Sequence, residues 1–119
     1  MIEAKENTDT GNRASELQRE LKRWIEILRN HYHPDKIVLF GSLANGTIHR
    51  WSDVDLVIIK DTDKAFLDRS KEVLSLIQPK VGVDILVYTH DEFRDLCASR
   101  LFFRTEIESR GVTVYERGG

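Results

Sequence analysis

Three aspartates and one glycine-serine pair are the residues of this sequence best suited to chemistry. Gly41 and Ser42 stand at the end of one apolar run. Asp53 and Asp55 open the next apolar run, and Asp84 lies inside a third. Because side chains alternate along a strand, Asp53 and Asp55 would point to the same face. If the strand that carries Asp84 lies nearby, the three carboxylates converge.

A divalent cation that carries phosphate groups is the partner such acids favour. Converging carboxylates repel one another, and an ionised carboxylate among apolar residues is costly unless a partner neutralises it. Oxygen ligands without cysteine or paired histidine suit Mg²⁺, and also Mn²⁺, better than Zn²⁺. Gly41 would let the backbone approach bound phosphates, and Ser42 offers a hydroxyl and an N–H at a helix start. We therefore interpret the five residues as one metal and nucleotide site.

The reaction expected at such a site is an in-line displacement at phosphorus. Two metal ions held by shared carboxylates would stabilise the attacking and leaving oxygens. Asp84 could also accept the proton of an attacking hydroxyl.

Taken singly, each feature has a plainer explanation. A glycine-serine pair after a strand is commonly a turn, and two aspartates at a strand start are commonly a solvated edge or a helix cap. Asp84 alone could be satisfied by a backbone N–H or by a salt bridge. The conjunction of all three features in this order favours the metal site.

The hydrophobic pattern predicts helices and strands in alternation around these residues. Ser15 and Gln18 form a capping-box pattern that predicts the start of the first helix, and Thr89 and Glu92 form a second one. Apolar spacing and breakers predict helices at 15–30, 42–45, 66–77 and 90–110, the last with a break near Ser99, and strands at 36–40, 53–59, 81–88 and 112–115. The expected fold is α/β or α+β, a sandwich of helices on a small sheet.

Size, charge and cysteine content limit the class of protein. The 119 residues fit one domain, expected over residues 14–117 after a flexible segment at 1–13. A net charge of −2 argues against a protein that depends on binding nucleic-acid backbones. No apolar run approaches the roughly 20 residues that span a bilayer, and the first residues do not resemble a signal peptide. Cys97 is the single cysteine, a candidate core residue, so a cytoplasmic protein without internal disulfides is expected.

The motif itself resembles a known signature. The run G-S-L-A-N-G, followed after five residues by S-D-V-D-L-V-I, is similar to that of the DNA polymerase β-like nucleotidyltransferase superfamily. The size of the chain resembles the minimal nucleotidyltransferases, or MNT proteins, and the ending I-E-S-R-G-V-T-V-Y-E is similar to theirs. The resemblance covers about residues 15–117.

The resemblance implies a role for each residue of the site. Gly41 and Ser42 would hold the nucleotide phosphates, while Asp53 and Asp55 would bind two Mg²⁺ ions. Asp84 would complete the metal site and act as the general base. The expected activity is nucleotidyl transfer with ATP as the substrate. The resemblance also implies the nucleotidyltransferase fold, a small mixed β-sheet with helices packed on it.

The resemblance also suggests a partner. Many MNT proteins are paired with HEPN-domain proteins in toxin–antitoxin systems, and some transfer AMP from ATP to a tyrosine of that partner. We therefore expect a HEPN-type partner and an oligomer or hetero-complex. The alternative is a non-catalytic subunit that neutralises such a partner by binding alone. Transfer to a small molecule such as an aminoglycoside is less favoured, because the chain leaves no room for a second domain.

Other residues leave alternatives open. Asn45 stands where many family members have arginine, and Arg50 could supply that cation instead. Trp51 could be a packing residue or could stack on a base. The run Leu101, Phe102 and Phe103 is too apolar for one helix face, so one of them could contact a partner, against a simple core role.

Overall fold

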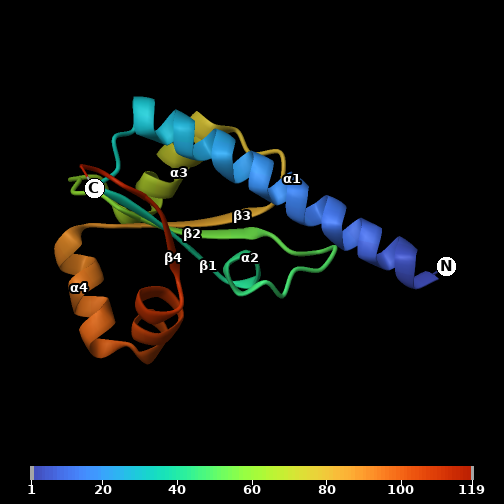
Figure 1. The fold of residues 1–119 in the computed structure, drawn as a ribbon. Coiled ribbons are helices and arrows are strands. Elements are labelled where there is room, and N and C mark those ends of the chain that lie inside the picture. Colours follow the sequence, from blue (N-terminus) through green and yellow to red (C-terminus); the bar gives the residue numbers. More distant parts are fainter. Residues whose placement is uncertain (1, 119) are drawn as a thin grey trace.

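A four-stranded sheet lies between two layers of helices in the computed structural model of this chain, which describes residues 2–118 and the side chains from residue 11 onward (Figure 1). The elements are α1 (Ile2–His31), β1 (Lys36–Phe40), α2 (Ser42–Asn45), β2 (Val54–Ile59), α3 (Phe66–Ile77), β3 (Val83–Tyr88), α4 (His90–Ser99), the π-helix η1 (Phe103–Ser109) and β4 (Val112–Glu116). The expected mixed α/β fold is confirmed. None of the helices within residues 2–118 combines the length and the apolar character needed to cross a membrane.

The strand order places the ends of three strands together. The sheet runs β3-β2-β1-β4, with β1 antiparallel to both of its neighbours and β2 parallel to β3. A parallel pair needs a crossover connection, which α3 supplies between β2 and β3. The last residue of β1 and the first residues of β2 and β3 therefore lie at the same end of the sheet.

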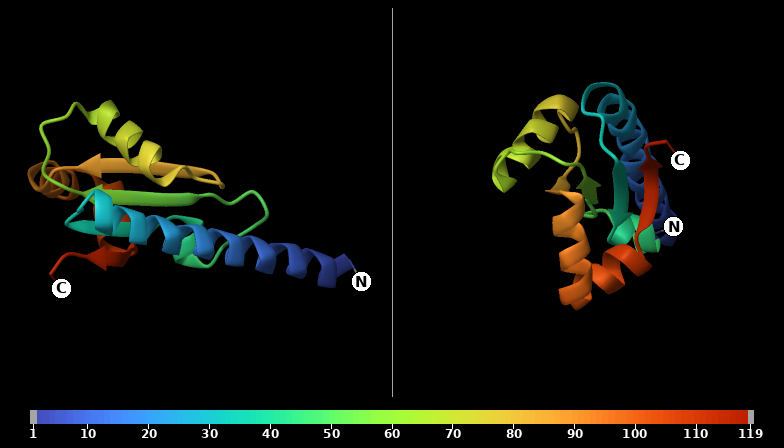
Figure 2. Two further views of the ribbon diagram at one scale, coloured as in Figure 1. Left: turned by 90° about the horizontal axis from the view of Figure 1, so that it is seen from above. Right: turned by 90° about the vertical axis from the view of Figure 1, so that its left-hand side faces the viewer.

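Alternating side chains divide the core into two layers. Val54, Leu56 and Ile58 pack into the layer that contains α1 and α3, where Trp24 is fully buried. Val57 and Ile59 join the second layer, together with residues of α4 and η1. Figure 2 shows α1 and α3 on one face of the sheet and α4 with η1 on the other. Residues of odd number in β2, including Asp55, therefore project toward the side of α4 and η1.

The predicted starts of α1, β2 and β3 are wrong. α1 begins at Ile2, so Ser15 lies inside the helix and does not cap its start. No proline interrupts residues 2–31, and one glycine costs a helix only about 1 kcal/mol, so the helix continues through Gly11. The two parallel strands begin at Val54 and Val83, later than predicted, where their ladder starts. The flexibility of residues 1–13 stays a prediction.

The structure of the segment after β3 agrees with the prediction made from the sequence. Thr89 and Glu92 form the predicted capping box at the start of α4. The predicted break near Ser99 is confirmed, because α4 ends there and the chain resumes as the π-helix η1.

Arg69 joins α3, β3 and α4 at the β3 edge of the sheet. Its side chain in α3 is 8% exposed and pairs with Glu92 of α4 at 2.7 Å. It also donates hydrogen bonds to the backbone oxygens of Lys64 and Val87. The guanidinium of Arg69 lowers the pKa of the Glu92 carboxyl. Loss of this cation would leave buried oxygens without their donor.

We expect Arg69→Ala to lower the free energy of unfolding by about 3 kcal/mol, because it removes a buried cation that pairs with Glu92 and donates to two backbone oxygens. Arg94→Ala is the matched control, since Arg94 pairs with Asp91 on the exposed surface and such pairs contribute about 0–1 kcal/mol. Urea unfolding measures both variants. Equal losses would show that Arg69 acts as an ordinary surface arginine.

Candidate active site

The parallel register sets two carboxylates side by side. Asp55 is the second residue of β2 and Asp84 the second residue of β3, and they are direct partners in the ladder. Registered residues of neighbouring strands project from the same face, at a strand spacing of about 4.8 Å. Asp55 is half-buried and Asp84 is exposed at the rim. The predicted approach of these two acids is therefore present.

The neighbourhood of Asp55 disfavours its negative charge. Burial, the charge of Asp84, hydrogen bonding with Asp84 and the charge of Asp53 together raise the pKa of Asp55 to about 6. Burial is the largest of these causes. A bound cation would reverse the effect, because it compensates both the burial and the repulsion. Oxygen ligands of this kind suit Mg²⁺ or Mn²⁺.

Two glycines leave room for the carboxylates. Gly41 has a φ of 75°, a conformation that side chains disfavour, and a Cβ there would lie 2.3 Å from Oδ2 of Asp55. A Cβ at Gly82 would lie 2.4 Å from Oδ1 of Asp53. Any larger residue at either position would displace an acid. Both glycines are therefore part of the site.

Asp53 is held separately from the other two acids. It lies just before β2, and its carboxylate is 3.5 Å from Nη2 of Arg13 in α1. Arg13 also donates to the backbone oxygen of Ser52, from Nε at 3.0 Å and from Nη2 at 2.8 Å. Ser52 is buried and its hydroxyl accepts a hydrogen bond from the backbone N–H of His49. Arg13 thus fixes the chain where it enters β2.

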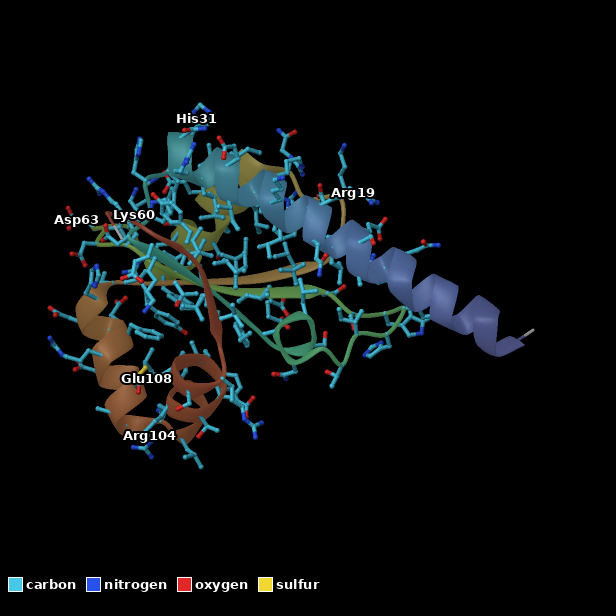
Figure 3. The ribbon with its side chains drawn as sticks, in the orientation of Figure 1. Arg19, His31, Lys60, Asp63, Arg104 and Glu108 are labelled. Carbon is cyan, nitrogen blue, oxygen red and sulfur yellow. The ribbon has the colours of Figure 1, made fainter. Side chains whose placement is uncertain are left out.

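A cleft rich in arginine lies beside this contact. Its volume is about 390 Å³, and its lining includes Arg13 and Arg19 of α1 and Arg50 of the loop before β2. Arg50 also lies over the ring of Trp51, 5.4 Å from the ring centroid. Figure 3 shows Arg19 on α1, across the sheet from Arg104 on η1. The cleft therefore offers positive charge on the α1 side of the acids.

A second group of possible ligands lies at the other end of the strands. Among the described residues, the ligand atoms of Asp35, Asp61 and His90 all lie within 4.8 Å of one another. Nε2 of His90 lies 2.8 Å from Asp35, and the backbone N–H of His90 donates to Asp61. Arg117 also pairs with Asp35 at 3.5 Å. These contacts join strand ends and the start of α4 without requiring a metal.

Each predicted site residue can now be placed. Asp55 and Asp84 are adjacent, and Gly41 and Ser42 begin α2 directly beside Asp55, where no side chain caps the helix start. Asp53 contributes its charge to Asp55 but is ion-paired with a residue of α1. The metal-binding and catalytic roles of these residues stay predictions.

Sequence reasoning missed Gly82 and Arg13. A glycine inside a predicted strand indicates a close approach of another group, so Gly82 carried a usable signal. Arg13 carried none, because its role depends on where α1 packs and it fell in a segment expected to be flexible.

Comparisons with known proteins identify the family and the fold. The family model of the nucleotidyltransferase domain matches residues 21–114. A solved structure from Sulfolobus solfataricus, named as a candidate nucleotidyltransferase, is similar over 92% of this chain and 88% of its own, with a TM-score of 0.67 and 18% identity. That identity supports the fold alone. No curated protein matches the chain.

The raised pKa of Asp55 predicts a pH-dependent cost in the absence of metal. The folded protein holds the proton up to about pH 6, whereas the ordinary pKa of an aspartate is 3.8. The stability that comes with the protonated carboxyl is therefore present in acid and lost as the pH rises through about 6. We expect Asp55→Asn to raise Tm above that of the wild type at pH 8 with a chelator, and to lose this advantage toward pH 4.

Thermal scans at the two pH values measure the difference. Asp63→Asn, which removes an exposed acid after β2, is the control and should change Tm equally at both. An Asp55→Asn advantage that does not depend on pH would contradict the account.

Proposed function

The chain belongs to the nucleotidyltransferase domain family, and we propose that it transfers a nucleotidyl group, AMP from ATP, to a hydroxyl group. The observation that carries the proposal is the registered pair Asp55 and Asp84, with Gly41 leaving space beside it. Nucleotidyltransferase domains generally act on nucleoside triphosphates with a divalent metal.

The residues present fit a divalent cation. Asp55 and Asp84 offer adjacent oxygens, and burial together with the charges of Asp84 and Asp53 raises the pKa of Asp55, a cost that a cation would offset. Asp53 would join them as a third ligand once its exposed carboxylate turns from Arg13. When bound, the metal would neutralise these acids and polarise the phosphate oxygens, and two ions could be held in this way. Mg²⁺ is the expected ion, with Mn²⁺ as a substitute.

The protein's own groups would bind and orient the nucleotide, and one of them would accept a proton. Gly41 and Ser42 would hold the phosphates at the start of α2, and Arg50 would supply the cation that Asn45 does not. The acceptor hydroxyl oxygen forms a bond to the α-phosphorus of ATP, and the bond from that phosphorus to the bridging oxygen breaks. Pyrophosphate leaves with the electron pair, and a carboxylate oxygen of Asp84 takes the hydroxyl proton.

For the acceptor, we propose a tyrosine hydroxyl of a HEPN-type partner, as in a toxin–antitoxin pair. The resemblance of the motif to MNT proteins motivates this choice. The surface supports a partner of some kind, because Leu67 and Leu101 are each 68% exposed. The alternative is neutralisation of the partner by binding alone, which Asn45 favours, since it removes a cation expected near the phosphates.

The transfer is tested with the complex of this chain and its HEPN-type partner. The complex is incubated with Mg²⁺ and with ATP labelled at the α- or the γ-phosphate. We expect the α-label, and not the γ-label, to remain on the partner. Asp55→Asn should lower the transfer by at least about 100-fold, because it removes charge that acts on the reacting phosphate.

Asp61→Asn is the matched control, since Asp61 lies after β2 at the opposite end of the sheet, and it should leave the rate unchanged. Full transfer by Asp55→Asn would refute the assignment. A triple Asp53→Asn/Asp55→Asn/Asp84→Asn variant that neutralises the partner as well as the wild type would favour the alternative.

A further inference from the structure

We propose that the ring of Phe102 stacks on the base of the nucleotide whose phosphates lie at Asp55 and Asp84. The inference rests on the proposed function and adds the part of the substrate that the acids do not bind. It assigns to the α4–η1 junction a role in recognising the nucleoside, a planar aromatic group.

A continuous row of side chains leads from the acids to this ring. Asp84, Asp55 and Phe40 are neighbours across β3, β2 and β1, each in direct register with the next. They therefore project from the same face of the sheet, the face covered further along by α4 and η1. The ring of Phe102 packs edge-on against that of Phe40, with centroids 6.1 Å apart. The side chain of Phe40 thus lies between Phe102 and Asp55.

The ring of Phe102 is held by neighbouring aromatic rings and is still half-exposed. Phe103 contacts it edge-on at 5.6 Å, and Tyr88 supports Phe103 in the same manner. Phe102 is nevertheless 50% exposed, and its neighbour Leu101 is 68% exposed. The two T-shaped contacts hold the ring in place, and half of its surface stays accessible to a further group. A base requires such a fixed and accessible aromatic ring for stacking.

The backbone next to Phe102 has a rare conformation. Phe102 immediately precedes η1, a π-helix of seven residues, and α4 has ended three residues earlier. π-helical turns are rare and occur frequently at functional sites. Leu101 and Phe102 are already helical and lead directly into η1, so Phe102 and Phe103 point in different directions from one helical run. Phe103 packs against the second core layer, and Phe102 lies half-exposed beside Phe40.

Trp51 is the other exposed aromatic residue on which the base could stack. It is the most exposed of the large apolar side chains described, at 77%, and it lies in the loop that leads to Asp53. The guanidinium of Arg50 already lies over the ring of Trp51, and Arg50 belongs to the arginine cleft on the α1 side. The phosphates would approach that positive charge, so the base is expected at the opposite side of the acids, where Phe102 lies. Stacking on Phe102 and stacking on Trp51 therefore predict different results when each residue is replaced.

Calorimetric titration with Mg²⁺–ATP and Mg²⁺–tripolyphosphate separates base binding from phosphate binding. We expect Phe102→Ala to weaken ATP binding roughly 5- to 100-fold while leaving tripolyphosphate binding unchanged, because stacking involves only the base. Trp51→Ala should leave the ratio of the two affinities as in the wild type. Phe102→Trp should keep ATP affinity, and its fluorescence should be quenched by ATP and not by tripolyphosphate. Thermal scans confirm that each variant is folded.

Four results would overturn the inference. Loss of ATP affinity in Trp51→Ala and not in Phe102→Ala would assign the base to the loop. An equal loss for both ligands in Phe102→Ala would make the ring a support for the acids. A wild-type protein that binds neither ligand would refute the proposed function itself, and the inference with it, whereas ATP binding that depends on Asp55 and ignores Phe102 would refute the inference alone.

Discussion

The half-buried carboxylate of Asp55, held beside that of Asp84, is the constraint around which the site is arranged. The parallel ladder sets the two carboxylates on one face, and partial burial makes their combined charge costly. An apolar sheet of four strands would be more stable with neutral residues at these positions. Carboxylates placed this way are expected where a cation and an anionic substrate offset the cost, and where strained or destabilised residues serve a reaction.

The neighbouring elements position these acids and leave space around them. α3 provides the crossover that makes β2 and β3 parallel, without which Asp55 and Asp84 would not be in register. Gly41 and Gly82 have no side chains that would displace the carboxylates. Beyond the acids, positive charge lies on the α1 side and an exposed aromatic ring on the η1 side. The two sides of the acid pair thus differ in chemistry, one cationic and the other aromatic.

Much of this arrangement could be predicted from local signals. β1, α2 and α3 have the predicted limits, because apolar runs and breakers define them, and the Thr89–Glu92 cap marks α4. The approach of Asp55 to Asp84 was conditional on strand pairing, which periodicity alone cannot decide. Arg13 could not be found, since its partner Ser52 is 39 residues away. The start of α1 was misplaced because a local capping pattern at Ser15 looked like a boundary although the helical sequence continued before it.

The central claim is that a metal–nucleotide complex binds at the Asp55–Asp84 end of the sheet. NMR spectra of ¹⁵N-labelled protein with ATP and Mn²⁺ test it most directly, because the paramagnetic ion broadens amide signals near its site. The account predicts selective broadening at Gly41, Asp55 and Asp84, and its loss in Asp55→Asn. Broadening centred instead on Asp61 and His90, or no selective broadening at all, would contradict the claim.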